Sequence, residues 1–222
     1  MKNKNILFVT IFSVAACGLH AMILNTQFNY YVYSSALKVI LFTLCPVIYF
    51  VVSKEGNFKD MFSKGDKKNI RRSFALGFIV LMFILIAFMV LRPFLDQAMI
   101  VDAFAKNGIT STNFPLVFIY VVLINATLEE IFFRGFVFMT LYRLNYKRYA
   151  HAYSCLLFAF YHVAILNNAV APGMFILFII GLAVAGLIFN YLVIKCKNVG
   201  GSLVVHISAN LAINLIVYVY YL

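Results

Sequence analysis

The chain has 222 residues, of which 64% are apolar and only 11% are charged. An ordinary soluble domain is about half apolar and about a quarter charged, so this composition excludes a soluble globular domain, a disordered chain and a nucleic-acid-binding module. We therefore interpret the formal net charge of +11 as the positive-inside bias of a membrane protein, not as a surface for a polyanion. The mean hydropathy of +0.97 supports a polytopic membrane protein.

Seven apolar runs follow one another along the chain, and most approach the roughly 20 residues that a membrane-spanning helix needs. We predict spans over residues 6–24, 36–52, 73–91, 114–142, 150–166, 172–194 and 202–222. The polar connections are short and leave no room for a second folded unit. The sequence therefore predicts an all-α protein, in which residues 1–222 form a single transmembrane helical bundle of about seven spans.

The first apolar run also has features of a secretory signal, because Lys2 and Lys4 precede it and residues 14–17 resemble a lipoprotein cleavage box. The apolar character continues through Leu24, so we interpret the run as an uncleaved first span, with cleavage at Cys17 as the alternative. The four cysteines show no metal-ligand or redox spacing, and we infer no disulfide framework.

Basic residues are distributed unequally between the two ends of the predicted spans. With the N-terminus in the cytoplasm, fourteen Lys and Arg residues lie on the cytoplasmic side, whereas Arg92, Lys106 and Lys38 lie outside. Lys38 is placed at the outer flank of the second span, and Arg134 is the one basic residue inside a span. Because Lys and Arg are enriched in cytoplasmic loops, we predict an N-in, C-out orientation.

Two adjacent carboxylates, Glu129 and Glu130, lie in the middle of the fourth run and are followed by Arg134. A carboxylate at this depth costs a few kcal/mol on insertion scales, so it needs a reason. Glu130 and Arg134 are four residues apart and can pair on one helix face, as a structural ion pair. Glu129 points about 100° away from that pair and is expected to be unpaired, which makes it a candidate functional group.

Two histidines lie inside predicted spans as well. His162 follows Phe158 by one helical turn in the fifth span, and His206 precedes Asn210 by one turn in the seventh. Either histidine alone could be a packing residue. Together with an unpaired carboxylate, they indicate a hydrolytic site.

The predicted chemistry is the hydrolysis of a peptide bond. Glu129 would accept a proton from water as general base, and His162 would hold and polarise that water. His206 and Asn210 would donate hydrogen bonds to the oxyanion that forms at the peptide carbonyl. Zinc is the alternative, since Glu129, His162 and His206 are ligand types that zinc takes. The usual helical zinc motif, His-Glu-x-x-His, is absent.

Three short motifs follow one another on three predicted helices: Glu129-Glu130-x-x-x-Arg134, Phe158-x-x-x-His162 and His206-x-x-x-Asn210. In this order they resemble the three motifs of the CAAX-protease and bacteriocin-processing family of intramembrane endopeptidases. The resemblance covers residues 114–214, which we treat as the family core. It implies that Glu129 is the catalytic base and that His162, His206 and Asn210 complete the site. Glu130, Arg134 and Phe158 are expected to support it.

The resemblance also implies the setting of the reaction. Members of the family were long described as metalloproteases and are now mostly viewed as glutamic enzymes, so we expect no cofactor, with zinc as the alternative. We expect a bacterial protein of the cytoplasmic membrane, with lipid and a membrane-associated peptide or protein as partners and no nucleic acid. Its site is expected in the cytoplasmic half of the bilayer. The alternatives are a non-catalytic scaffold or bacteriocin-immunity protein and, third, a proton-coupled carrier that uses the same buried groups.

Overall fold

The computed structural model describes residues 2–24, 31–53, 56–63, 65–166 and 169–222. Helices make up 87% of the structure, and its described part contains no β-strand, so the predicted all-α class is confirmed. Seven helices of this described part are long and apolar enough to cross a membrane: Asn3–Leu24, Tyr31–Ser53, Lys67–Phe94, Phe114–Arg143, Lys147–Leu166, Pro172–Cys196 and Gly200–Tyr220. Each overlaps one predicted span, and the ends differ by a few residues.

Five of these spans are built around a single α-helix: α1 (Lys2–Leu24), α2 (Tyr31–Ser53), α4 (Lys67–Leu91), α11 (Pro172–Cys196) and α12 (Gly200–Tyr220). The fifth span consists of α9 (Lys147–Tyr161) and α10 (Val163–Leu166). The short helices α3 (Phe58–Met61) and α5 (Gln97–Lys106) connect spans, and the 3₁₀ turn η1 (Arg92–Phe94) ends the third span.

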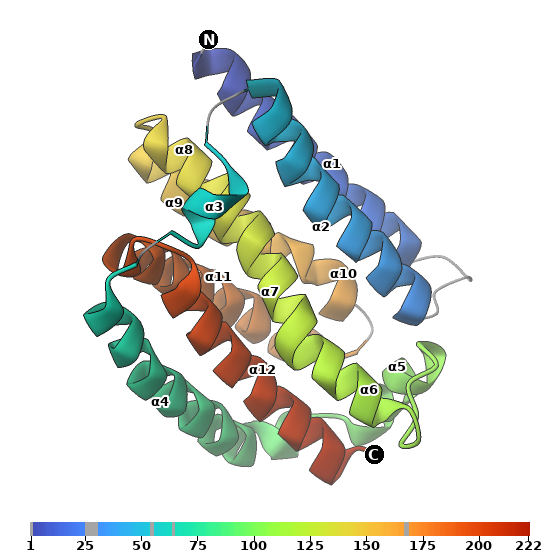
Figure 1. The fold of residues 1–222 in the computed structure, drawn as a ribbon. Helices are drawn as coiled ribbons and strands as arrows, with labels where there is room; N and C mark the ends of the chain where they lie inside the picture. The colour runs from blue at the N-terminus through green and yellow to red at the C-terminus, as the bar shows by residue number, and fades with distance from the viewer. Residues whose placement is uncertain (1, 25–30, 54–55, 64, 167–168) are drawn as a thin grey trace.

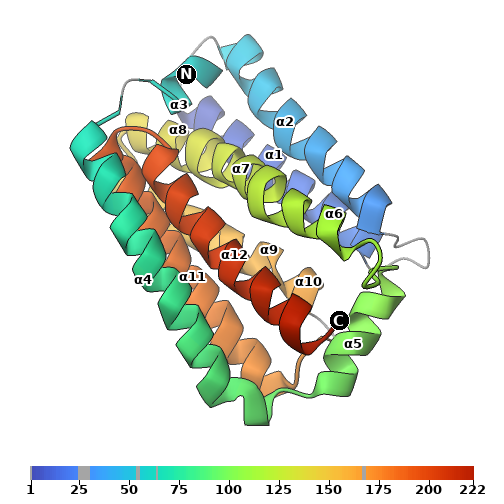
Figure 2. The same cartoon turned by 60° about the horizontal axis from the view of Figure 1, so that its bottom comes forward.

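The fourth span is the centre of the bundle. It is one continuous helical rod made of five segments: α6 (Phe114–Ile119), η2 (Tyr120–Asn125), α7 (Ala126–Glu129), η3 (Glu130–Phe138) and α8 (Met139–Arg143). From residue 129 to residue 141, every residue except Ile131 is buried. Figures 1 and 2 show this rod between the α1–α2 pair on one side and α4 with α12 on the other. Functional groups on the rod are therefore enclosed by helices from both halves of the chain.

Two parts of the central rod, η2 and η3, are π-helical, an irregularity that is often found at functional sites. Side chains from neighbouring helices hydrogen-bond to backbone carbonyls inside these wider turns. Asn210 of α12 donates from Nδ2 to the carbonyl of Val121 at 3.0 Å. Ser154 of α9 donates from its hydroxyl to the carbonyl of Phe133, also at 3.0 Å. The wider turns thus fix how α9 and α12 dock on the rod.

The short helix α3 sets the level at which α12 begins. The backbone N–H of Val199 donates to the carbonyl of Met61 at 3.0 Å, immediately before α12 starts at Gly200. The side chain of Met61 packs directly on Gly135 of the central rod, where a Cβ would meet its sulfur. Gly135 and Val199, the residue before α12, therefore lie at a similar level, because both contact Met61. This level is a reference for the depth of the site.

Candidate active site

Glu129, the last residue of α7, is almost completely buried, with 1% of its surface exposed. One carboxylate oxygen, Oε1, accepts hydrogen bonds from Lys38 Nζ at 2.5 Å and from Asn125 Nδ2 at 3.1 Å. Lys38 Nζ also donates to Asn125 Oδ1 at 2.5 Å. The other oxygen, Oε2, has no hydrogen-bond partner among the described residues. The prediction that Glu129 is unpaired is therefore wrong, although one of its two oxygens is free.

The charge distribution predicted Lys38 at the outer flank of its span, and this prediction is wrong. Lys38 is the eighth residue of α2, and its side chain is 5% exposed. Its ammonium lies over the ring of Tyr161, 4.8 Å from the centroid, and 5.4 Å from the ring centroid of Phe42. The predicted span began at residue 36, whereas the helix begins at Tyr31. The earlier start places the lysine inside the bundle, against Glu129.

Both intramembrane histidines face the free oxygen of Glu129. His162 caps the C-terminus of α9, and its Nε2 is 4.0 Å from Glu129 Oε2. His206 of α12 has its Nε2 3.4 Å from the same oxygen. On the far side of each ring, Nδ1 of His162 is 2.8 Å from the Phe158 carbonyl, and Nδ1 of His206 is 3.0 Å from Glu130 Oε1. The structure thus brings three of the predicted site residues around one point.

The partners of the two Nδ1 atoms assign the tautomers of the rings. A backbone carbonyl only accepts hydrogen bonds, so Nδ1 of His162 must be the donor, and an ionised Glu130 requires the same of His206. In the neutral imidazole form, each ring then presents a lone pair at Nε2. Two nitrogen lone pairs and the Oε2 atom of Glu129 therefore converge with no proton donor between them.

Glu130 and Arg134 form the predicted pair one turn apart, with Arg134 Nη1 3.5 Å from Glu130 Oε1. Both side chains are fully buried. The guanidinium carbon of Arg134 lies 4.2 Å from the ring centroid of Phe158 and 4.7 Å from that of Phe189. Its nitrogens have no hydrogen-bond partner among the described residues. Arg134 is therefore held by charge and by two aromatic rings, and Phe158 contacts it directly.

Replacing Arg134 with Met is expected to destabilise the protein by about 3–5 kcal/mol, because it leaves the Glu130 carboxylate buried without its cation. The unfolding midpoint in detergent measures this loss. In the double variant Glu130→Gln/Arg134→Met, no charge is stranded, so part of the stability should return. A single variant that unfolds like the wild type would contradict the structural role of the pair.

Asn210 lies one turn after His206 on α12, and the structure joins it to the central rod through Val121. This hydrogen bond uses one of its two amide hydrogens. The second hydrogen is available for the predicted oxyanion role. The contact with Val121 could not be predicted from the sequence pattern, since it depends on the π-helical turn of η2.

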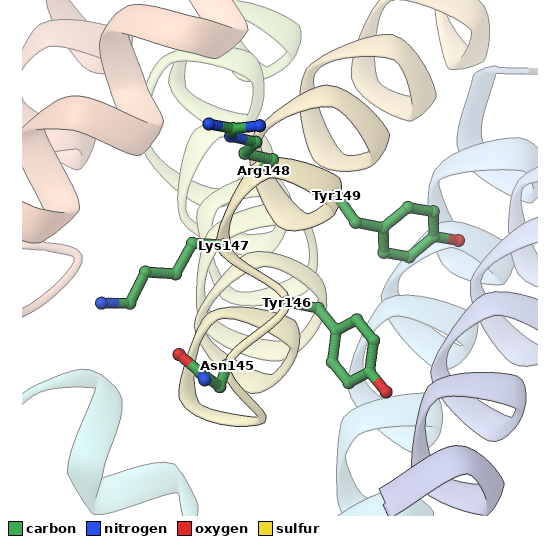
Figure 3. A pocket seen from close by; sticks show the side chains of 5 residues that line it. All are labelled: Asn145, Tyr146, Lys147, Arg148 and Tyr149. Carbon is green, nitrogen blue, oxygen red and sulfur yellow. The ribbon is translucent and has the colours of Figure 1, made fainter.

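A surface hollow of about 370 Å³ lies at the turn from α8 to α9 (Figure 3). Asn145, Tyr146, Lys147, Arg148 and Tyr149 line it. Its two tyrosines point toward α1, where their hydroxyls hydrogen-bond to Asn3 and Thr10. None of its lining residues contacts Glu129, so we interpret the hollow as a seam between α9 and α1 and not as the candidate active site.

Fold and site together define a polytopic membrane protein with a buried cluster of carboxylates and histidines. A protein-family model described as "Type II CAAX prenyl endopeptidase Rce1-like" matches residues 111–212. Neither a curated protein nor a solved structure matches the chain. This match over residues 111–212 confirms the CAAX-protease family predicted from the three motifs. The family indicates a CAAX-type intramembrane protease, and the seven apolar helices of the described residues make it an integral membrane protein.

Proposed function

We propose that this protein hydrolyses a peptide bond of a membrane-associated peptide or protein, with Glu129 as the general base for a water molecule. The observation that carries the proposal is the free oxygen of Glu129, which is buried and faced by the Nε2 atoms of His162 and His206. A water molecule at this point can donate one hydrogen to Oε2 and the other to one of the two histidine nitrogens.

In the proposed reaction, water between Glu129 and the two histidines loses one proton to Oε2 as its oxygen bonds to the peptide carbonyl carbon. The other hydrogen of the water is accepted by Nε2 of His162 or of His206, which orients the water. For His206 this replaces the predicted role as an oxyanion donor. The remaining amide hydrogen of Asn210 stabilises the oxyanion. Glu129 then returns the proton to the leaving nitrogen as the C–N bond breaks, giving a carboxylic acid and an amine.

We place the site in the cytoplasmic half of the bilayer, with the N-terminus inside. The segment around α3 carries several basic residues, among them Lys59, Lys67 and Lys68, which favours the cytoplasm for that end. Gly135 lies level with α3, because Met61 of α3 packs on it. Glu129 is six residues from Gly135, which corresponds to about 9 Å of helical rise. Half of a hydrocarbon core is about 15 Å. The distance therefore favours the half on the α3 side. We also propose a bacterial cytoplasmic membrane, as the family resemblance implies.

We further propose that the reaction needs no metal. The donor types of Glu129, His162 and His206 suit zinc. The described residues, however, contain no group of three His, Cys, Asp or Glu arranged to hold a metal ion. The ammonium of Lys38 is already 2.5 Å from Glu129 Oε1, and a second cation at Oε2 would be repelled by it. These observations support a reaction without a resident metal ion.

Purified protein in lipid nanodiscs is expected to cleave members of a quenched peptide library, and a strong chelator should leave the rate unchanged. Fluorescence release with and without chelator measures this, and added zinc is the control. Loss of cleavage in chelator, with recovery on added zinc, would overturn the metal-free mechanism and keep the peptidase. If folded protein cleaves no peptide, and a Glu129→Gln strain keeps the wild-type phenotype, a scaffold or immunity role takes the place of the enzyme.

A further inference from the structure

The geometry points to Lys38 as a positioning residue for Glu129, supplied by a helix that lies outside the family match. This inference rests on the proposed role of Glu129 as base. Lys38 belongs to α2, whereas the match begins at residue 111. The N-terminal helices would therefore take part in the chemistry and not only enclose the core.

A buried ammonium needs an energetic reason to be there. Taking an ion out of water costs several kcal/mol, and inside a membrane the cost is offset only by a charged or polar partner. Lys38 has two such partners, the carboxylate of Glu129 and the side-chain oxygen of Asn125. Asn125 in turn donates to the same Glu129 oxygen. The three side chains form a closed triangle of hydrogen bonds, in which Glu129 Oε1 accepts from both Lys38 and Asn125.

This triangle fixes the rotation of the carboxylate. With two donors on Oε1, the other oxygen is directed to His162 and His206, where the proposed water binds. The ammonium also favours the ionised carboxylate, because an opposite charge within about 4–6 Å stabilises the charged form. A general base must be ionised before it can accept a proton. Lys38 therefore supports proton transfer in two ways: it orients the carboxylate of Glu129 and it favours its ionised form.

The polar and charged groups around Glu129 come from three neighbouring helices and from its own rod. Lys38 approaches from α2, His162 from the end of α9 and His206 from α12. On its own rod, Glu130 is paired with Arg134 and accepts from His206. Arg134 therefore pairs with Glu130. Among the Lys and Arg residues that the structure describes, Lys38 is the one that pairs with Glu129.

Packing along α2 holds Lys38 at the required depth. Lys38, Phe42, Cys45 and Tyr49 are buried at helical spacing on one face. The ring of Phe42 stacks on Phe132 of the central rod at 4.0 Å between centroids, and that of Tyr49 lies 5.5 Å from Phe136. These aromatic contacts continue from Lys38 toward the other end of the helix. They keep α2 from sliding along the rod, so the ammonium stays opposite Glu129.

The test is Lys38→Met, which keeps the length and apolar stem of the side chain and removes the charge. We expect kcat per folded molecule to fall about 10²-fold with KM unchanged, the size of effect that a misplaced general base gives. Lys38→Arg, which keeps the charge, should recover at least about ten-fold of that loss. Lys106→Met is the matched control, because Lys106 pairs with Asp102 on the exposed surface. A purely structural role would reduce the amount of folded protein and leave kcat per folded molecule near the wild-type value.

A double-mutant cycle tests the pairing of Lys38 with Glu129 without an activity measurement. Lys38→Met should lower the unfolding midpoint or prevent folding, and the added Glu129→Gln should restore the fold by removing the stranded charge. Failure of Glu129→Gln to restore it would overturn the pairing. Unchanged kcat in folded Lys38→Met would overturn the positioning role and leave the proposed peptidase intact. A Glu129→Gln protein that still cleaves would instead overturn the proposed function, whatever the cycle gives.

Discussion

Glu129→Gln is expected to abolish cleavage by the protein that folds, and to lower the unfolding midpoint because the ammonium of Lys38 loses its counter-charge. The amide has nearly the same shape, and its oxygen can still accept a hydrogen bond from Lys38, but it cannot take a proton from water. Loss of a general base typically lowers the rate by about 10²–10⁴-fold. The measurement is kcat in nanodiscs, normalised to folded protein by size-exclusion chromatography and the unfolding midpoint.

Asp102→Asn is the matched control for this change, since it also replaces a carboxylate with an amide. Asp102 lies on α5 in an exposed ion pair with Lys106, 2.6 Å apart. Its substitution should leave kcat within about two-fold, as surface pairs of this kind contribute little. A folded Glu129→Gln protein that keeps more than about a tenth of wild-type kcat would contradict the assignment of the base.

His206→Ala is expected to have the second largest effect on kcat, a loss of about 10²-fold. His206 contacts both carboxylates, with Nε2 3.4 Å from Glu129 and Nδ1 3.0 Å from Glu130. Removing it takes away one acceptor for the proposed water and leaves two acidic side chains without the ring between them. Part of the effect should therefore be seen as a lower unfolding midpoint.

His151→Ala is the corresponding control for histidine removal. His151 lies on α9, where its ring contacts those of Phe138 and Tyr142. These contacts contribute to packing and do not involve the buried carboxylates. We expect kcat per folded molecule to be unchanged in His151→Ala. If it falls as far as in His206→Ala, the special role of His206 is contradicted.

The spans were predictable from sequence, because apolar runs of sufficient length have one stable form in a bilayer. The same holds for the pair of Glu130 and Arg134, since one helical turn separates them whatever the tertiary fold. Lys38 was missed because its partner lies 91 positions away, and the span boundary was set too late by a few residues. The cost of an intramembrane lysine was a usable signal, as it requires a partner such as Glu129.

The depth of His206 could not be obtained from helix lengths alone. Counted from the start of its span, His206 is only six residues deep, whereas Glu129 is fourteen residues from the end of the central rod at Arg143. The structure removes this mismatch because α3 places the start of α12 level with Gly135. From that level both residues are six positions away. Contacts of a short connecting helix carry no periodic signal in the sequence.

The most direct test of the central claim is to follow oxygen from water into the product. Folded wild-type protein in nanodiscs would be incubated with the peptide library in ¹⁸O-labelled water, beside Glu129→Gln. We predict pairs of products whose new carboxyl group carries one solvent oxygen, formed by the wild type and absent with Glu129→Gln. Labelled products that form equally with both proteins would contradict the role of Glu129, and folded wild-type protein that yields none would contradict the peptidase itself.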